Sequence, residues 1–499
     1  MKTQSTAAPG LLPGLLPGLL LGLLPGLLLT AAAGPASALE FTDCELSGAN
    51  GGLIIQADCA SLQVPEDHAR PDGRQIELYF ARIPARSREP AQDPLIFFAG
   101  GPGQSATESY PQVHAALSRL NGKRDIWLLD QRGTGQSTPL PCEIPPELLL
   151  DEPSDELMIN MAKNCRTELE ADGTDLSQYT TTDAARDVET LRRLMGSPQL
   201  NLVGGSYGTR MALSYLRQYP EAVRSVVLDS VVPPEVALGQ DHARHLDAAL
   251  EQLFALCRAN PDCAQRYGDP ADSLQTLRAQ LRAQPIVMEI ADPVTHEPIT
   301  ERFNHDALSG LVRLYSYSPE SAALLPLLID EALKGRAGPL LAQGRMLVAQ
   351  LVDAIYYGMQ LSVSCAEDAP LLEIREQDSQ RLMGNELVRL LKLQCAHWPI
   401  GERPENFHAP VTSEHPVLLI SGELDPVTPP AYAERVHQQL PNSRHLIAPG
   451  QGHIAMTRGC MARLIDQFIE TLESEELDAT CLAELSPPAF FLNYLGTAP

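Results

Sequence analysis

The sequence is poor in positive charge. Its 499 residues include 37 Lys and Arg but 63 Asp and Glu, which gives a formal net charge of −26. Nucleic acids and anionic membrane surfaces attract proteins through a positive field, so this balance argues against both as partners. A cationic substrate would be drawn to such a surface, although acidity usually serves only solubility. The hydrophobic fraction of 44% fits a soluble globular protein with a large core.

Metal-binding and repeat patterns are also missing. The chain has no C-x-x-C pair and no cluster of Cys and His with the spacing of zinc ligands. No period of about 20 to 50 residues recurs either. The sequence therefore predicts no metal site and no repeat fold. Its length favours one large domain with an insertion, or two domains.

Residues 1–38 have the pattern of a secretory signal peptide. Lys2 supplies a positive start, residues 11–29 are an apolar run of Leu, Gly and Pro, and residues 36–38 offer a small-x-small cleavage site. The repeated Leu-Leu-Pro-Gly units break a helix too often for a membrane span. We predict cleavage after Ala38, export to the periplasm or the medium, and no stable membrane association afterwards. An uncleaved anchor is the alternative.

The ten cysteines of the sequence are consistent with the predicted export. An even number of cysteines in an exported chain indicates disulfides rather than catalytic thiols or metal ligands. Ten cysteines allow roughly a thousand sets of pairs, so the sequence alone does not fix the pairing. Proximity along the chain favours Cys44 with Cys59, Cys142 with Cys165, Cys257 with Cys263, Cys365 with Cys395, and Cys460 with Cys481.

Strand and helix patterns alternate along much of the chain. Short apolar runs alternate with amphipathic helix patterns, which predicts an α/β fold with a mostly parallel sheet flanked by helices. Helix patterns dominate from 233 to 410, so we predict a core formed by 39–232 and 411–499 with a helical insertion between them. The strand patterns cover 53–55, 75–83, 94–98, 125–129, 200–203, 225–229, 416–420 and 445–447, and the helix patterns cover 182–196, 245–258, 274–283, 306–315, 321–333, 340–357 and 461–472.

A glycine-rich turn at Ser206 joins the strand pattern 200–203 to a helix pattern. Its sequence, Gly-Gly-Ser-Tyr-Gly, matches the nucleophile elbow, in which glycines permit a turn tight enough to expose a serine hydroxyl above a sheet edge. The helix that follows would aim its N-terminal amides at an oxyanion formed there. Ser206 is therefore the candidate nucleophile. A plain Gly-Ser loop is the alternative if no acid and base accompany it.

Asp425 and His453 supply the acid and the base. Asp425 follows the strand pattern 416–420, and His453 follows the strand pattern 445–447. The chain order Ser, Asp, His is that of the α/β-hydrolases. His453 would deprotonate Ser206 and later protonate the leaving group, while Asp425 would hold the imidazole tautomer.

An oxyanion formed at the scissile carbonyl needs two N–H donors. We assign them to the backbone of Tyr207, directly after the nucleophile, and to the backbone of Gly101. Gly101 lies in the glycine loop 99–103, which follows the strand pattern 94–98. In this loop only glycine would let the backbone approach a ligand closely.

Five short motifs surround the predicted site. They are Gly-Gly-Pro-Gly at 100–103, Asp-Gln-Arg-Gly-Thr-Gly at 130–135, Gly-Ser-Tyr-Gly-Thr at 205–209, Leu-Asp-Pro-Val-Thr-Pro at 424–429 and Gly-His at 452–453. Together they resemble the proline iminopeptidase and tripeptidyl aminopeptidase branch of the α/β-hydrolases, and the segment from Cys460 to Cys481 is similar to the C-terminal region of its secreted members. The resemblance implies release of residues or short peptides from free N-termini, no cofactor, and a helical insertion that caps the active site. Ala99 stands where many members have His, which leaves the subfamily open.

An exopeptidase must also hold the α-ammonium of its substrate at a fixed distance from the nucleophile, which requires carboxylates in the cap. Glu367 and Asp368 are the candidates, because a disulfide from Cys365 to Cys395 would rigidify them near Trp398; a solvated acidic turn is the alternative. We therefore expect an exported aminopeptidase that cleaves peptides through an acyl-enzyme. A carboxylesterase or lipase with the same triad is the alternative, and a non-catalytic binding protein is less favoured because such proteins usually lose a triad member. The number of residues released, a preference for proline and the oligomeric state stay open.

Overall fold

A mixed sheet lies at the centre of the structure, a computed structural model that describes residues 39–48, 52–144, 153–293 and 295–497. Within these residues the sheet has nine strands in the order β1-β2-β3-β5-β4-β6-β7-β10-β11. The predicted signal peptide, residues 1–38, lies outside the described residues. The strands are β1 (Thr42–Leu46), β2 (Ile55–Pro65), β3 (Gln75–Ile83), β4 (Leu95–Phe98), β5 (Ile126–Leu129), β6 (Leu200–Gly205), β7 (Val223–Asp229), β10 (Val417–Gly422) and β11 (Ser443–Ala448).

The strands from β5 to β11 in this order run parallel to one another. The first three strands are joined antiparallel, and β3 also pairs antiparallel with β5. Strands β4, β5, β6 and β10 are buried along their whole length, as is typical of parallel strands that are covered on both faces. The prediction of an α/β fold with a mostly parallel sheet is confirmed.

The winding of the chain reverses at β4. From β4 the chain crosses to β5 on one side, and it then returns to β6 on the other side of β4. At such a switch point the loops that leave two neighbouring strands diverge, which opens a crevice beyond the carboxyl ends of the strands. The loop after β4 holds Gly101 and the turn after β6 holds Ser206, so both predicted motifs lie at this point.

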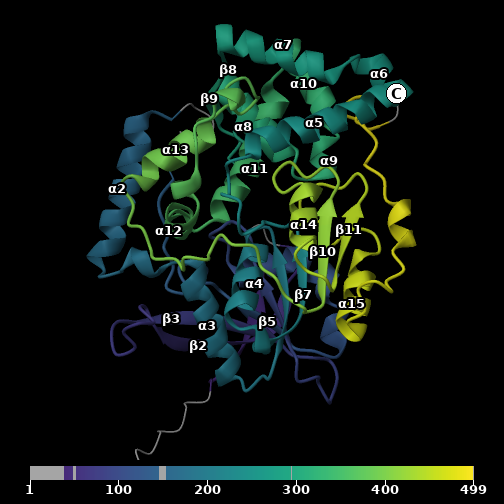
Figure 1. Cartoon of the computed structure of the whole chain (residues 1–499). Coiled ribbons are helices and arrows are strands. Elements are labelled where there is room, and N and C mark those ends of the chain that lie inside the picture. Colours follow the sequence, from purple (N-terminus) through teal and green to yellow (C-terminus); the bar gives the residue numbers. More distant parts are fainter. Residues whose placement is uncertain (1–38, 49–51, 145–152, 294, 498–499) are drawn as a thin grey trace, which may run out of the picture. The chain divides into compact units, whose positions relative to one another are not determined.

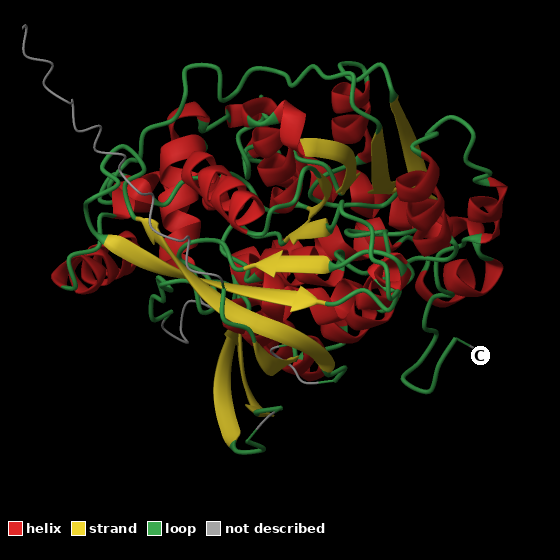
Figure 2. Ribbon diagram, turned by 90° about the horizontal axis from the view of Figure 1, so that it is seen from below, coloured by secondary structure: helices red, strands yellow, loops and turns green. Residues whose placement is uncertain are grey.

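Helices cover both faces of the sheet (Figures 1 and 2). On one face α1 and α15 share a core with Val203 and Leu418. On the other face α3, α4 and α14 share a core with Leu202, which precedes Val203, and with Leu419, which follows Leu418. This alternation reflects the period of two along a strand. The helices on the two faces are α1 (Ala106–Leu117), α3 (Thr181–Leu194), α4 (Tyr207–Gln218), α14 (Pro430–His437) and α15 (Met461–Thr471). Helix α2 (Asp155–Ala171) belongs to a separate hydrophobic cluster.

The chain between β7 and β10 forms a helical group, which lies beyond the carboxyl ends of the strands in Figure 1. Elements α5 to α11 of this group share their own core, to which Leu424 and Phe490 contribute. The group consists of α5 (His242–Ala259), α6 (Pro261–Tyr267), α7 (Pro270–Ala283), β8 (Ile286–Ala291), β9 (Pro298–Phe303), α8 (His305–Tyr315), α9 (Pro319–Ala322), α10 (Leu325–Leu333), α11 (Gly338–Asp353), α12 (Tyr357–Glu367) and α13 (Glu386–Cys395).

Two helices of this group are interrupted where the sequence predicts continuous helix. The pattern 321–333 is divided between α9 and α10, because Pro326 lacks the N–H that a continuous helix needs and suits the first turn of a new one. The pattern 340–357 ends at Asp353, and α12 continues after a bend of 76°. By length and apolar composition α11 and α12 together resemble a broken membrane span, whereas no single described helix does.

Five disulfides join segments that are close in the chain, and they are the pairs that chain proximity favours. One of them ties the edge strand β1, where Asp43 and Glu45 are exposed, to β2. Another ties α12 to α13 beside the buried Trp398. The described chain has no free cysteine. The bridges are Cys44–Cys59, Cys142–Cys165, Cys257–Cys263, Cys365–Cys395 and Cys460–Cys481.

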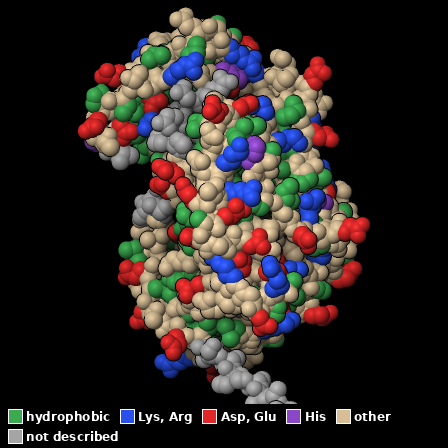
Figure 3. All heavy atoms as spheres, turned by 90° about the vertical axis from the view of Figure 1, so that its left-hand side faces the viewer, with side chains coloured by type: hydrophobic (Ala, Val, Ile, Leu, Met, Phe, Trp, Pro, Cys, Tyr) green, Lys and Arg blue, Asp and Glu red, His purple; other side chains and the backbone are tan. Residues whose placement is uncertain are grey.

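Charged side chains of both signs are mixed on the surface. On the face shown in Figure 3, Asp and Glu side chains are interspersed with Lys and Arg. The net charge of −26 is therefore not gathered into one acidic patch on this face. This distribution fits a role in solubility.

Candidate active site

Ser206 lies in a strained turn between β6 and α4. Its φ of 54° and ψ of −125° lie outside the regions that L-residues ordinarily occupy, and such strain clusters at functional sites. The Ser206 N–H donates to Asp229 O at 2.9 Å, which fixes the turn to the end of β7. A Cβ atom on Gly208 would lie 2.1 Å from Phe98 O, so the packing of α4 against β4 requires glycine there. The geometry is that of a nucleophile elbow.

The glycine loop 99–103 lies directly beside this serine. A Cβ atom on Gly100 would lie 3.2 Å from Ser206 Cβ. Gly101 has a φ of 104°, which glycine tolerates without strain. The two backbone segments predicted to supply oxyanion donors, at Gly101 and at Tyr207, therefore lie on either side of Ser206, the candidate nucleophile.

Asp130, at the end of β5, supports the glycine loop from behind. Its fully buried carboxylate accepts hydrogen bonds from Ser105 Oγ at 2.8 Å and from Thr107 N at 2.9 Å, at the start of α1. It also accepts a hydrogen bond from Gln136 N at 3.2 Å in its own turn. The turn 130–135 thus holds the beginning of α1, and with it the end of the glycine loop.

Asp425 and His453 form a direct pair. Asp425 Oδ2 lies 2.8 Å from His453 Nδ1. The same carboxylate accepts hydrogen bonds from Val427 N, Thr428 N and Thr428 Oγ1, each at 2.9 Å, and these bonds fix its orientation. Because Nδ1 faces the carboxylate, Nε2 is the ring nitrogen that remains for a reacting group.

The two charges of this pair stabilise each other. Burial acts to lower the pKa of His453, but the charge and hydrogen bond of Asp425 outweigh it, so that pKa is raised above 6.5. Burial likewise acts to raise the pKa of Asp425, yet its interaction with His453 and two backbone N–H groups keep that pKa below 3.8. An imidazolium formed during a reaction would be stabilised at this position.

Comparison with known proteins places this arrangement in a family. Residues 93–457 match the family model of the α/β hydrolase fold. The chain belongs to that family. The hydrolase is 26% identical over 503 residues to a tripeptidyl aminopeptidase of Streptomyces lividans, a match that covers 92% of this chain and 89% of that protein. It is 24% identical over 465 residues to a serine protease of Mycobacterium tuberculosis, covering 86% of this chain and 88% of that protein. A solved proline iminopeptidase of Mycobacterium smegmatis aligns with a TM-score of 0.39 and 16% identity over 83% of this chain and 97% of its own.

Asp229 and Ser230 connect the nucleophile turn of the hydrolase to the histidine loop. The Asp229 carboxylate accepts hydrogen bonds from Ala455 N at 3.1 Å and Met456 N at 2.7 Å. Ser230 Oγ accepts one from Ile454 N at 2.8 Å. Burial raises the pKa of Asp229 to about 6. Sequence reasoning missed this pair, although an acidic residue at the carboxyl end of a parallel strand is a usable signal.

Tyr317, from the turn between α8 and α9, packs against His453, the predicted base. Its ring lies edge-on to the His453 ring with 5.2 Å between the centroids. Its carbonyl oxygen accepts a hydrogen bond from His453 N at 2.8 Å. The helical group between β7 and β10 of the hydrolase therefore contacts the site directly. Nothing in the sequence pattern around Tyr317 predicts this contact.

Glu367 and Asp368, predicted to bind a substrate ammonium, are buried at the end of α12. Glu367 accepts hydrogen bonds from Thr181 N at 2.7 Å and Thr181 Oγ1 at 2.8 Å. Asp368 accepts one from Arg210 Nη1 at 2.9 Å, and Arg210 is also buried. The alternative of a solvated turn is wrong. These internal partners link α12 to α3 and α4, whereas Asp368 Oδ2 is buried without a hydrogen-bond partner among the described residues. The ammonium role of the two carboxylates stays a prediction.

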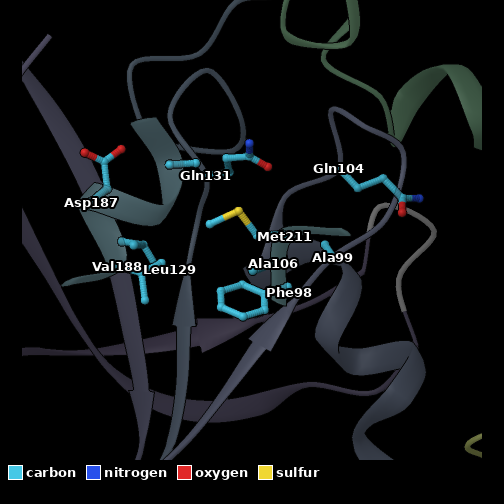
Figure 4. A pocket seen from close by; sticks show the side chains of 10 residues that line it. Phe98, Ala99, Gln104, Ala106, Leu129, Gln131, Asp187, Val188 and Met211 are labelled. Carbon is cyan, nitrogen blue, oxygen red and sulfur yellow. The ribbon is translucent and has the colours of Figure 1, made fainter. Parts of the chain in front are cut away.

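A small cavity lies between the start of the glycine loop and helices α3 and α4 (Figure 4). It is lined by Ala99, Gln104, Gln131 and Met211 among others. Its volume of about 20 Å³ suits one water molecule rather than a substrate. Among the residues described, no group of three or more His, Cys, Asp or Glu is arranged to hold a metal ion.

Proposed function

We propose that this hydrolase is an exported serine aminopeptidase that cleaves peptides from free N-termini through an acyl-enzyme. The observation that carries the proposal is the pair of Asp425 and His453, held by Asp229 and Ser230 against the strained turn of Ser206. Relatives named as a tripeptidyl aminopeptidase and a serine protease, matched over 92% and 86% of this chain, support a peptide substrate.

The reaction follows from the roles of the three side chains. His453 Nε2 takes the proton of Ser206 Oγ as the oxygen attacks the scissile carbonyl carbon. The N–H groups of Gly101 and Tyr207 bind the resulting oxyanion. Collapse of the intermediate breaks the C–N bond, and His453 gives its proton to the leaving amine. A water molecule then attacks the acyl-enzyme with the same base and returns Ser206 to its free form.

Export agrees with the remaining features. Residues 1–38 would be removed as a signal peptide, and five disulfides are typical of proteins that fold in an oxidising compartment. Residues 233–410 would act as the cap that selects substrates, since Tyr317 from this segment contacts His453. Such a cap leaves the sheet machinery unchanged and limits which peptides reach Ser206.

Glu108 is our candidate for the ammonium site in place of the buried pair on α12. It lies in the first turn of α1, immediately after the glycine loop, and is half-buried. Tyr356 OH donates to Glu108 Oε1 at 3.1 Å, and Tyr356 N donates to Gly103 O at 2.8 Å. One carboxylate oxygen therefore remains for a substrate. Burial, and then the nearby Asp130, raise the pKa of Glu108, a penalty that a bound ammonium would relieve.

A labelled fluorophosphonate tests the enzyme class, because it should modify wild-type protein but not the Ser206→Ala variant. N-acetylation of a peptide substrate then tests the exopeptidase, which should lose activity on the blocked peptide. Equal turnover of blocked peptides and p-nitrophenyl esters would instead identify an esterase. Glu108→Gln should raise KM for free-amine peptides and leave ester hydrolysis unchanged, whereas Glu221→Gln, the same charge change at an exposed position, should change neither.

A further inference from the structure

Arg313, on α8, is a half-buried cation that has no acidic partner among the described residues. Its one hydrogen bond among the described residues runs from Nη2 to Tyr317 OH at 2.8 Å. Its Nε atom is buried, and no described residue accepts a hydrogen bond from it. Most buried guanidinium groups in this chain face a carboxylate, as Arg132 faces Asp187 and Arg210 faces Asp368. Arg313 is therefore a charge whose counter-ion is absent from the described protein.

His242, the first residue of α5, has the same property. Its side chain is more than nine-tenths buried, with 8% exposed, and neither ring nitrogen has a hydrogen-bond partner in the part of the chain that the structure describes. Burial, and then the charge of Arg313, lower its pKa well below the ordinary value, so the ring is neutral. A neutral imidazole offers one N–H donor and one acceptor. Buried polar groups that lack partners usually indicate a missing ligand or water.

Both residues lie beside the catalytic pair. His245, one turn after His242 on the same face of α5, approaches Val427 O at 3.0 Å in the loop that orients Asp425. Arg313 holds the hydroxyl of Tyr317, whose ring packs on His453. Two helices of the segment between β7 and β10 thus bring unpartnered donors to the side of the site where His453 lies.

The position of His453 defines which part of a substrate these donors face. The same imidazole that activates Ser206 must protonate the leaving nitrogen, so the leaving group lies against His453. Side chains that pack around His453 therefore face the part of the peptide that follows the scissile bond. In a short peptide that portion ends in a free α-carboxylate, which pairs with a guanidinium more strongly than a neutral carbonyl does.

We propose that Arg313 and His242 bind the α-carboxylate of a single leaving amino acid. This inference rests on the proposed peptidase function and specifies its substrate class: short peptides in which one residue follows the scissile bond. Arg313 supplies the charge, and the N–H of His242 supplies a second donor. The bound carboxylate provides the partner that both groups lack among the described residues.

The experiment compares peptides that differ only in the C-terminal group. Tetra-alanine and Pro-Ala are each offered to the mature protein as the free acid and as the amide, and kcat/KM is measured for both forms. Wild-type protein should prefer the acid by about 10- to 100-fold, the range expected for one charge-assisted contact. Arg313→Gln should remove most of this preference, and Arg313→Lys should retain part of it. Arg336→Gln, which removes an exposed charge from the same segment, should leave the preference unchanged.

The ratio of the two forms separates binding from positioning. Any effect of Arg313 on the ionisation of His453 changes both substrates equally and cancels in the ratio. Equal turnover of acid and amide by wild-type protein would overturn the inference, and so would a loss in Arg313→Gln that is the same for both forms. If Arg313→Gln fails to fold, His242→Gln provides the same test. Failure to cleave any free-amine peptide would instead refute the proposed function.

Discussion

Asp229 offers a sharp test of how His453, the proposed base, is held. We consider Asp229→Asn, which keeps the size of the side chain but replaces one carboxylate oxygen by an NH₂ group. In the native protein both oxygens accept backbone N–H groups of the histidine loop, from Ala455 and Met456. In the variant one of these N–H groups faces another donor. The loop that carries His453 therefore loses one of its attachments to β7.

The effect of Asp229→Asn on the free energy of unfolding is the sum of two opposing contributions. A hydrogen bond to a charged acceptor contributes about 1.5 to 3 kcal/mol, which is lost at one N–H group. On the other side, the rise in the pKa of Asp229 from 3.8 to about 6 means that the buried charge costs the folded state about 3 kcal/mol at neutral pH. The variant no longer has this cost, so its free energy of unfolding should change little. The lost hydrogen bond should instead raise the activation free energy of the reaction, because His453 is held less firmly. An increase of about 1.5 to 3 kcal/mol lowers kcat by about 10- to 150-fold.

The assay combines stability with a pH profile. Urea unfolding at pH 7.5 should give similar midpoints for the wild type and Asp229→Asn, while kcat falls as stated. Asp229 also raises the pKa of His453, so the acid limb of kcat/KM should move to lower pH in the variant. Asp58→Asn, at a partly exposed ion pair far along the sheet, should alter neither quantity. A kcat within threefold of wild type, with an unmoved acid limb, would refute the role assigned to Asp229.

Three further predictions concern other contacts. Because the pKa of His453 is raised and only the neutral ring can accept a proton, the acid limb of wild-type kcat/KM should lie above pH 6.5; Asp425→Asn should lower kcat by about 10⁴-fold when initial rates are measured. Burial raises the pKa of Glu367 from 4.5 to about 7, so ionisation of Glu367 lowers the free energy of unfolding as pH rises from 4.5 to about 7. In urea unfolding, the free energy of unfolding of Glu367→Gln should exceed that of wild type by up to about 3 kcal/mol at pH 8 and by almost nothing at pH 4.5. Replacing Cys365 and Cys395 together by Ser opens a loop of 30 residues and should lower the free energy of unfolding by about 3 to 4 kcal/mol in the same assay, and an unchanged value would show that the bridge constrains little.

The features that the sequence predicts are those fixed by local backbone demands. A side chain at Gly208 would collide with Phe98 O, so the elbow motif is recognisable without knowledge of the fold. The mostly parallel sheet follows from apolar runs such as 95–98, which suit strands covered on both faces. The disulfide pairing could be predicted from proximity along the chain, because the entropic cost of closing a loop is smallest for short loops.

The features that the sequence does not predict depend on contacts between distant segments. The acidic residues at the end of α12 look like a solvated turn until Arg210, more than 150 residues earlier, is placed beside them. Tyr317 reaches His453 only because the turn between α8 and α9 lies above the strand ends. Asp229 looks like the last residue of a strand until the histidine loop folds over it. Burial and pairing at these positions are consequences of tertiary packing.

The bridge between β1 and β2 has a consequence for how the folded protein avoids aggregation. An edge strand exposes unpaired backbone groups that recruit the edges of other molecules, and sheets that join in this way lead to aggregation. Here the edge strand is short, carries the exposed carboxylates of Asp43 and Glu45, and is fastened by Cys44 to Cys59 on its neighbour. The like charges repel a second copy, and the covalent link keeps β1 from detaching to expose the longer and more apolar β2. Formation of the Cys44–Cys59 disulfide therefore helps to prevent this edge of the sheet from pairing with the sheet of another molecule.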